Sequence, residues 1–151
     1  MKISVAQALK EKKRLAGEIA CLWQLFKNEN SCLETHKRKI DVKETLQTIE
    51  HYTAKLVELK TKISLANQGD HLRNMQLLDE TRHRLSKLDA VSGSEDPERN
   101  GLDGWTERTA VFSEKQLNAM KQQLRRDADQ LQDKIDEHNA KVRFDFETPL
   151  K

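Results

Sequence analysis

The chain has 151 residues and a net charge of +2; 36% of the residues are hydrophobic, 34% are charged and 5% are aromatic. Ala, Glu, Lys, Leu and Arg make up about half of the sequence, a bias typical of long helices and coiled coils. This composition excludes collagen, a disulfide-rich scaffold and an all-β sandwich, and it argues against a doubly wound α/β fold.

The first residues and the two cysteines indicate a cytoplasmic protein. The start, Met-Lys-Ile-Ser-Val, lacks the apolar core of a signal peptide, and no stretch approaches the ~18–20 apolar residues of a membrane span. Cys21 and Cys32 are typical of free thiols in a reducing cytosol. We therefore expect a soluble, cytoplasmic protein.

Heptad spacing of apolar residues predicts four helices, at about residues 4–27, 41–67, 70–89 and 113–141. Ser4 is a suitable N-cap for the first helix, because its hydroxyl can accept a hydrogen bond from an unpaired backbone N–H. The second helix starts at Ser31 or at Asp41, since each begins a capping-box pattern with a glutamate three residues later. Gly69 can take a left-handed conformation after this helix, and Asp70 can cap the third helix.

One long loop and two extended segments complete the predicted fold. Residues 91–105 form an acidic loop with three of the five glycines. Alternating apolar and polar residues predict extended segments at 106–112 and 142–147. A capping box at Ser113 starts the last helix, whose length of roughly 40 Å separates the two segments. Because an isolated strand is unstable, we expect these segments to pair between chains.

These elements predict an all-α fold. We expect residues 1–151 to form a single helical domain, an elongated antiparallel helical bundle or coiled coil of about four helices with the two short extended segments. Polar residues that interrupt the apolar seams commonly fix helix register and the number of partners. The candidates for this role are Lys12, Thr53, Lys60, Asp127 and His138. The candidate interface residues are Trp23, Phe26, Val142, Phe144 and Phe146.

Four short patterns follow one another along the chain: Val5-Ala-Gln-Ala8-Leu9, Ile63-x-x-Ala66-Asn67, Leu77-Leu78-Asp79 and Ile135-Asp-Glu137-His-Asn139. In order and spacing they resemble an uncharacterised family of mostly helical bacterial proteins that is sometimes labelled septicolysin. The resemblance covers nearly the whole chain. It implies a helical, oligomeric fold and no established catalytic residues.

Two groups of residues match the spacing of metal or catalytic sites only in part. Glu80-x-x-His83 has the spacing of a di-iron ligand pair, but the chain holds no second Glu-x-x-His. Cys21, Cys32 and His36 do not have a standard zinc spacing and lack a fourth ligand nearby. A Cys-His nucleophilic pair stays open, although no local signature supports it. We expect no metal, no cofactor and no enzymatic activity, because no nucleophile elbow or paired acid is visible.

Charge is unevenly distributed along the chain. Residues 1–41 carry nine Lys or Arg and five Asp or Glu, whereas residues 89–107 carry six acids and one base. The acidic loop could therefore settle near a basic helix end of the same or a neighbouring chain. Three basic clusters, Lys10 to Arg14, Lys37 to Lys39 and Arg125-Arg126, could contact phosphates. They are interleaved with acids and lack a stacking set of aromatic residues, which favours solvated helix faces.

The expected function is a non-catalytic structural or protein-interaction module that self-assembles through helical seams as a homo-oligomer, with an unknown protein as a further partner. One alternative is a helical nucleic-acid-binding protein that uses the basic clusters. A second is a membrane-active helical bundle, which would need Trp23, Phe26, Phe144 and Phe146 to become exposed. The composition argues against both nucleic acid and a membrane as partners.

Overall fold

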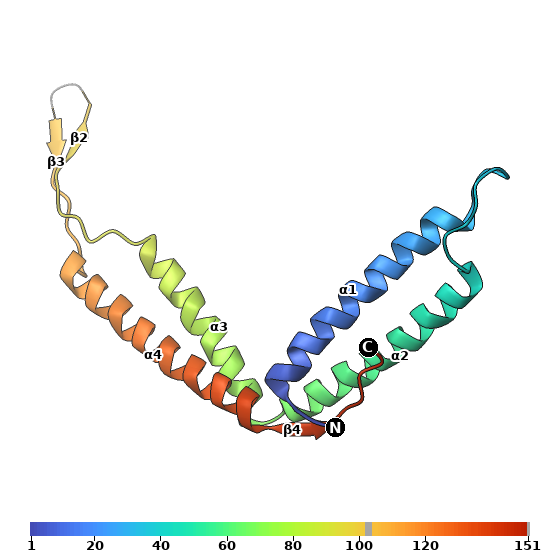
Figure 1. The fold of residues 1–151 in the computed structure, drawn as a ribbon. Helices are drawn as coiled ribbons and strands as arrows, with labels where there is room; N and C mark the ends of the chain where they lie inside the picture. The colour runs from blue at the N-terminus through green and yellow to red at the C-terminus, as the bar shows by residue number, and fades with distance from the viewer. Residues whose placement is uncertain (102–103, 151) are drawn as a thin grey trace. The chain divides into compact units, whose positions relative to one another are not determined.

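The computed structural model describes residues 1–101 and 104–150, and this part of the chain contains four helices and four short strands (Figure 1). In chain order they are β1 (Lys2–Ser4), α1 (Val5–Asn30), α2 (Val42–Ala66), α3 (Asp70–Asp89), β2 (Glu98–Asn100), β3 (Gly104–Thr106), α4 (Glu114–Lys141) and β4 (Arg143–Asp145). The all-α fold predicted from the heptad spacing is confirmed, with four helices and only short strands.

The chain forms two compact units. Unit 1 comprises Met1–Gln68 and Asp136–Lys151, and unit 2 comprises Gly69–Ile135. The boundary falls inside α4, whose last six residues belong to unit 1. The single helical domain expected from the sequence thus consists of one continuous unit and one unit made of two chain segments.

The first helix of unit 1 starts at a complete capping box. The Gln7 backbone N–H donates to Ser4 Oγ at 3.2 Å, and the Ser4 backbone N–H donates to Gln7 Oε1 at 2.8 Å. These two bonds satisfy donors that the first turn of a helix otherwise leaves unpaired. Ser4 is therefore the N-cap that the sequence predicts.

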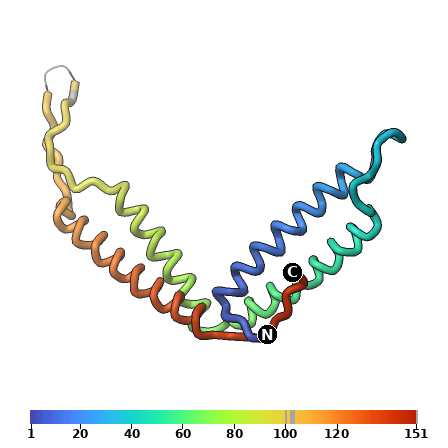
Figure 2. Tube along the Cα trace, viewed as in Figure 1, coloured from blue at the N-terminus to red at the C-terminus, as the bar shows by residue number. Residues whose placement is uncertain are grey.

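The second helix starts at Val42, because Asp41 caps it. Asp41 Oδ1 accepts hydrogen bonds from the backbone N–H groups of Lys43, at 2.9 Å, and Glu44, at 3.1 Å. Ser31, the alternative start, directly follows the last residue of α1 and begins no helix. Helices α1 and α2 lie side by side as a hairpin, joined by residues 31–41 (Figure 2).

A two-stranded antiparallel sheet closes unit 1. Strand β1 pairs with β4 in the register Lys2 to Asp145, Ile3 to Phe144 and Ser4 to Arg143. The expectation that residues 142–147 pair with another chain is therefore wrong, because β1 of the same chain is their partner. A strand of three residues is too short to show a twofold alternation, which is why the sequence did not reveal β1.

The core of unit 1 lies between this sheet and the helix hairpin. Phe146 is only 3% exposed and packs in one cluster with Ile3, Ala8, Leu15, Leu59 and Ile63. Lys62 on α2 holds the sheet in place, since its Nζ donates to the Asp145 carbonyl at 2.6 Å and lies 5.9 Å from the centre of the Phe146 ring.

The end of α2 is joined to the end of α4 by a side chain. His138 Nε2 lies 3.0 Å from the Ala66 carbonyl oxygen, one of the helix-end acceptors that α2 cannot satisfy internally. Gly69 has a positive φ of +74°, which glycine favours, but the C-cap of α2 is Asn67 and not the glycine that the sequence predicted. It is Gly69, and not Asp70, that occupies the N-cap position of α3, and no side chain caps this helix.

Unit 2 consists of α3, the part of α4 that ends at Ile135, and the segment that joins these helices. Leu78 on α3 and Leu117 and Leu124 on α4 are buried. Arg82 Nη2 donates to Gln132 Oε1 at 3.1 Å, and Lys121 pairs with Asp89 at 3.5 Å. These contacts hold α3 and α4 side by side.

Gly93 closes the segment onto the start of α4. Its backbone N–H donates to Glu114 Oε1 at 2.6 Å. A Cβ atom at position 93 would lie 2.5 Å from the Glu114 backbone nitrogen, which no real side chain tolerates. Ser113 and Gln116 form the predicted capping box, with hydrogen bonds of 2.9 and 3.2 Å.

The acidic loop contains a β-hairpin, whereas the sequence predicted a single extended segment at 106–112. Strand β2 pairs with β3 in the register Glu98 to Thr106, Arg99 to Trp105 and Asn100 to Gly104. Residues 107–112, expected to be extended and paired with another chain, lie outside any strand. The strands instead flank Gly101, whose φ of +77° suits a tight turn.

We predict that Phe146→Ala lowers the free energy of unfolding by about 3–5 kcal/mol, because it leaves a cavity in the core of unit 1. Urea unfolding followed by circular dichroism measures this change. Phe112→Ala is the matched control: Phe112 is half exposed, so the expected change is within about 0.5 kcal/mol. A loss at position 146 no larger than that of the control would contradict the placement of Phe146.

Candidate interaction surface

The surface of unit 1 has a shallow groove between its two helices, which we call the α1–α2 groove. It has a volume of about 450 Å³ and is open to solvent. Its lining residues are Trp23, Leu46, Ile49, Glu50, Thr53 and Ala54. The groove brings together one predicted interface residue, Trp23, and one predicted register-setting residue, Thr53.

The groove has an apolar floor and an aromatic rim. Ile49 is buried and Leu46 is half-buried, so both are held by packing within the chain. Trp23 is 48% exposed. Its ring meets Phe26 edge to face, with ring centres 5.5 Å apart and planes at 80°, an arrangement that aromatic pairs prefer. Phe26 thus fixes the orientation of Trp23 at the rim.

Exposed apolar residues continue along α2 beyond the groove. Val57 is 58% exposed and lies one helical turn after Thr53. Leu65 is 60% exposed and lies two further turns along the helix. Single exposed apolar side chains are ordinary on protein surfaces, but a strip that runs on from an apolar groove indicates an interaction surface.

Two of the other candidate interface residues, Phe144 and Phe146, pack within their own chain. Phe146 belongs to the core of unit 1, and Phe144 packs against the same cluster. Val142 is half-buried, and its carbonyl accepts a hydrogen bond from the Val5 backbone N–H at 3.0 Å. Phe144 and Phe146 are therefore used within the chain, and the interface role of Val142 stays a prediction.

The five candidate register-setting residues do not gather in one place. Thr53 lines the α1–α2 groove, and Lys60 is exposed on the same helix. Lys12 is half-buried on α1. Asp127 belongs to unit 2, where it accepts a hydrogen bond from Gln123 Nε2 at 2.9 Å. His138 contacts the end of α2 in its own chain, as described above.

A buried carboxylate that the sequence did not single out organises the connection between α1 and α2. Glu29 Oε2 accepts a hydrogen bond from the Lys39 backbone N–H at 3.1 Å and lies 3.1 Å from His36 Nε2. Arg38 donates to the carbonyls of Glu29, at 2.9 Å, and Asn30, at 3.2 Å, and so caps the end of α1. Residues 31–41 therefore fold back onto the last turn of α1.

The electrostatics of Glu29 follow from these contacts. The hydrogen bond from the Lys39 backbone N–H and, after it, the contact with His36 hold the pKa of the Glu29 carboxyl below its ordinary value. Lys62 and Lys55 likewise lower the pKa of Glu58 on α2. Glu29 is thus held by local hydrogen bonds, and Glu58 by ion pairs with Lys55 and Lys62.

The candidate metal and thiol sites of the sequence are separate surface features. Cys21 is exposed and Cys32 half-buried, both as free thiols, while His36 has Glu29 as its partner. Glu80 and His83 are exposed on α3. Within residues 1–101 and 104–150, no group of three or more His, Cys, Asp or Glu side chains is placed to hold a metal ion.

The basic clusters lie on separate elements. Lys10 to Arg14 are on α1, where Arg14 pairs with Glu11 at 3.6 Å. Lys37 to Lys39 belong to the α1–α2 connection, where Arg38 caps the helix. Arg125 and Arg126 are exposed on α4. No helix in the described part of the chain is long and apolar enough to cross a bilayer.

Comparison of the chain with family models, curated proteins and solved structures finds no match. The resemblance to the family labelled septicolysin stays a prediction from the sequence.

We predict that Glu29→Gln lowers stability at neutral pH, because the variant loses the charge that Lys39 and His36 stabilise. A lowered pKa means that the folded state favours the carboxylate. Its stabilising effect is therefore complete above the ordinary glutamate pKa and is lost as the pH falls through the lowered value. Urea midpoints of the two proteins should differ at pH 7 and converge at acidic pH; a difference that is independent of pH would contradict this origin.

Proposed function

We propose that the protein is a non-catalytic interaction module that self-assembles into a homo-oligomer by burying exposed helical faces, with the α1–α2 groove at the centre of the contact. The observation that carries this proposal is Trp23. It is half exposed, oriented by Phe26, and placed at the rim of an apolar groove. Tryptophan is the residue type most enriched among those that dominate binding energy at protein interfaces.

The shape of the groove suits a helix from a second copy. Two packed helices present a channel between their side-chain ridges, into which the residues of a third helix can insert. On α3, Leu72 and Met75 are exposed and lie three residues apart, so they share one face. The chain therefore carries both a channel and an apolar strip of the kind that fills such a channel.

The free energy gained by burying apolar side chains, compared with the cost of association, indicates how far the contact must extend. Fully burying a Val or Leu side chain contributes about 1.5–3 kcal/mol, and these residues are already partly buried. Association itself costs about 4–15 kcal/mol. The groove alone does not offset this cost, so the proposed contact continues along α2 through Val57 and Leu65. A standard interface covers about 800 Å² on each partner.

Thr53 would set the alignment of such a contact. A polar residue within an apolar helical interface favours arrangements in which its hydroxyl keeps a hydrogen-bond partner, and it disfavours shifted ones. The membrane-active alternative, in contrast, would have to expose Phe144 and Phe146, which pack in or against the core of unit 1.

The test is the mass of the protein in solution. The chain has a mass of 17.5 kDa, so gel filtration with light scattering should give a multiple of this value at micromolar concentration. Trp23→Glu places a charge in the contact and should weaken association by about thirty-fold or more, equivalent to the ~2 kcal/mol loss that marks an interface hot spot. Circular dichroism should show unchanged helix content.

Leu33→Glu provides the matched control. Leu33 is more exposed than Trp23 but lies in the connection between α1 and α2, outside the groove. Its substitution should leave the mass unchanged. A wild-type protein that stays monomeric at high concentration would overturn the proposed function. Equal effects of Trp23→Glu and Leu33→Glu would overturn the role of the groove.

A further inference from the structure

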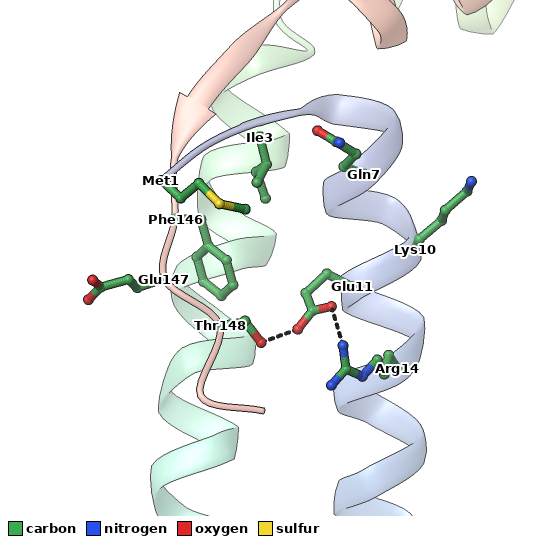
Figure 3. A pocket seen from close by; sticks show the side chains of 9 residues that line it. All are labelled: Met1, Ile3, Gln7, Lys10, Glu11, Arg14, Phe146, Glu147 and Thr148. Atoms are coloured by element: carbon green, nitrogen blue, oxygen red, sulfur yellow. Dashed lines mark hydrogen bonds and ion pairs between the residues drawn. The ribbon is translucent and has the colours of Figure 1, made fainter. Parts of the chain in front are cut away.

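A second hollow of unit 1 is chemically different from the α1–α2 groove. It has a volume of about 580 Å³ and lies between the start of α1 and the segment that follows β4 (Figure 3). We call it the β1–α1 pocket. Met1, Ile3 and Phe146 form its apolar wall. The volume falls within the ~300–1,000 Å³ range of pockets that bind compact ligands or side chains.

The opposite wall of the β1–α1 pocket is polar. Glu11 accepts a hydrogen bond from the Thr148 hydroxyl and pairs with Arg14 at 3.6 Å (Figure 3). The carboxylate can accept further hydrogen bonds, because its two oxygens offer about four lone-pair sites. The pocket thus combines an aromatic and a sulfur contact with a fixed acceptor and a guanidinium group.

These features suit a tryptophan side chain. An indole ring packs favourably against an aromatic edge, a methionine sulfur and a guanidinium group, which here are Phe146, Met1 and Arg14. Its single N–H needs an acceptor when it is buried, and Glu11 provides one. A purely aliphatic occupant would leave the polar wall unused.

The chain carries such a side chain in an accessible place. Trp105 lies on β3 of the hairpin in unit 2 and is 70% exposed. Its cross-strand partner is Arg99. The hairpin is short and its strands have open edges, so it can enter a contact without disturbing the helices of unit 2.

The N-terminal segment beside the pocket and the hairpin have opposite net charge. Residues 1–14 carry five Lys or Arg and one acid, Glu11, while the pocket lining itself is balanced, with Lys10 and Arg14 against Glu11 and Glu147. Lys10, at the rim of the β1–α1 pocket, extends away from its walls (Figure 3). Exposed acids flank the hairpin strands: Glu95, Asp96, Glu98 and Glu107, against the bases Arg99 and Arg108. Such complementarity directs encounter and orientation.

We infer that the β1–α1 pocket binds the Trp105 hairpin of a second copy of this chain. The indole of Trp105 lies against Phe146 and Met1, and the acidic flanks of the hairpin face Lys10 and its neighbours on α1. This inference rests on the self-assembly in the proposed function, but it uses a different surface. Because the two contacting patches differ, the contact joins copies head to tail or reciprocally in pairs.

The first test compares association constants measured by sedimentation equilibrium. Trp105→Ala should weaken association by about thirty-fold or more, as expected for a hot-spot tryptophan. Val111→Ala is the control, since Val111 is apolar, even more exposed and close in sequence; its constant should equal that of the wild type. Lys10→Glu should also weaken association, and this effect should shrink at high salt. An unchanged constant for Trp105→Ala would overturn the inference.

The second test distinguishes a contact between copies from one within a chain. Trp105→Ala keeps an intact pocket, and Lys10→Glu with Arg14→Glu keeps an intact hairpin. A mixture of the two variants should associate more tightly than either variant alone, because one supplies the intact pocket and the other the intact hairpin. If mixing gives no tighter association, the inference is wrong. In protein labelled with 5-fluorotryptophan, the ¹⁹F resonance of Trp105 should also lose its solvent isotope shift on assembly, whereas an unchanged shift would contradict burial.

The two proposals fail in different ways. A wild-type monomer would overturn both of them. Association that is lost in Trp23→Glu but kept in Trp105→Ala would overturn only the hairpin contact. Association that is lost in Trp105→Ala but kept in Trp23→Glu would support the hairpin contact. It would also contradict the proposal that the α1–α2 groove takes part in the assembly.

Discussion

The pairing of β1 with β4 is the contact on which unit 1 depends. It aligns Ile3 with Phe144 and brings Phe146 against the α1–α2 hairpin. Two helices alone offer few positions that are shielded from water, and the sheet covers their open end with aromatic and aliphatic side chains. Ser4 ends β1 and also caps α1, so one residue aligns the sheet and the helix. The α1–α2 groove and the β1–α1 pocket are bounded by elements that this pairing or the helix hairpin holds in place.

The helices could be predicted because their signals are local. Seven-residue spacing of apolar residues and the caps at Ser4, Asp41 and Ser113 act within a few positions along the chain. Strand pairing is not local, because β1 and β4 are about 140 residues apart. The sequence of a three-residue strand does not indicate which other strand pairs with it. The β2–β3 hairpin was missed for a related reason. The alternation of residues 106–112 suggested a strand, but the turn at Gly101 places the paired residues earlier.

The candidate surface was predicted in part. Trp23, Phe26 and Thr53 follow from the width and the interruptions of the helical stripes. Phe146 shows why the other candidate interface residues could not be assigned correctly. An apolar pattern indicates that a residue is buried, but not whether its own chain or another chain buries it. The role of Glu29 was not predicted at all, because its partners, residues 36 and 39, lie in a segment without periodicity. Tertiary contacts alone assign these roles.

The division of the chain has a consequence for its synthesis. Unit 2 is one continuous stretch of the chain, Gly69–Ile135, so its residues are all synthesised before those of β4. Unit 1 starts before unit 2 in the chain, but its β4 and Phe146 are synthesised only after unit 2. While unit 2 is being translated, Ile3 and the inner faces of α1 and α2 are therefore uncovered, and exposed apolar surface favours misassociation. We expect nascent chains to depend most on chaperones in this interval. This holds even though the early part of the chain is rich in lysine, a charged side chain.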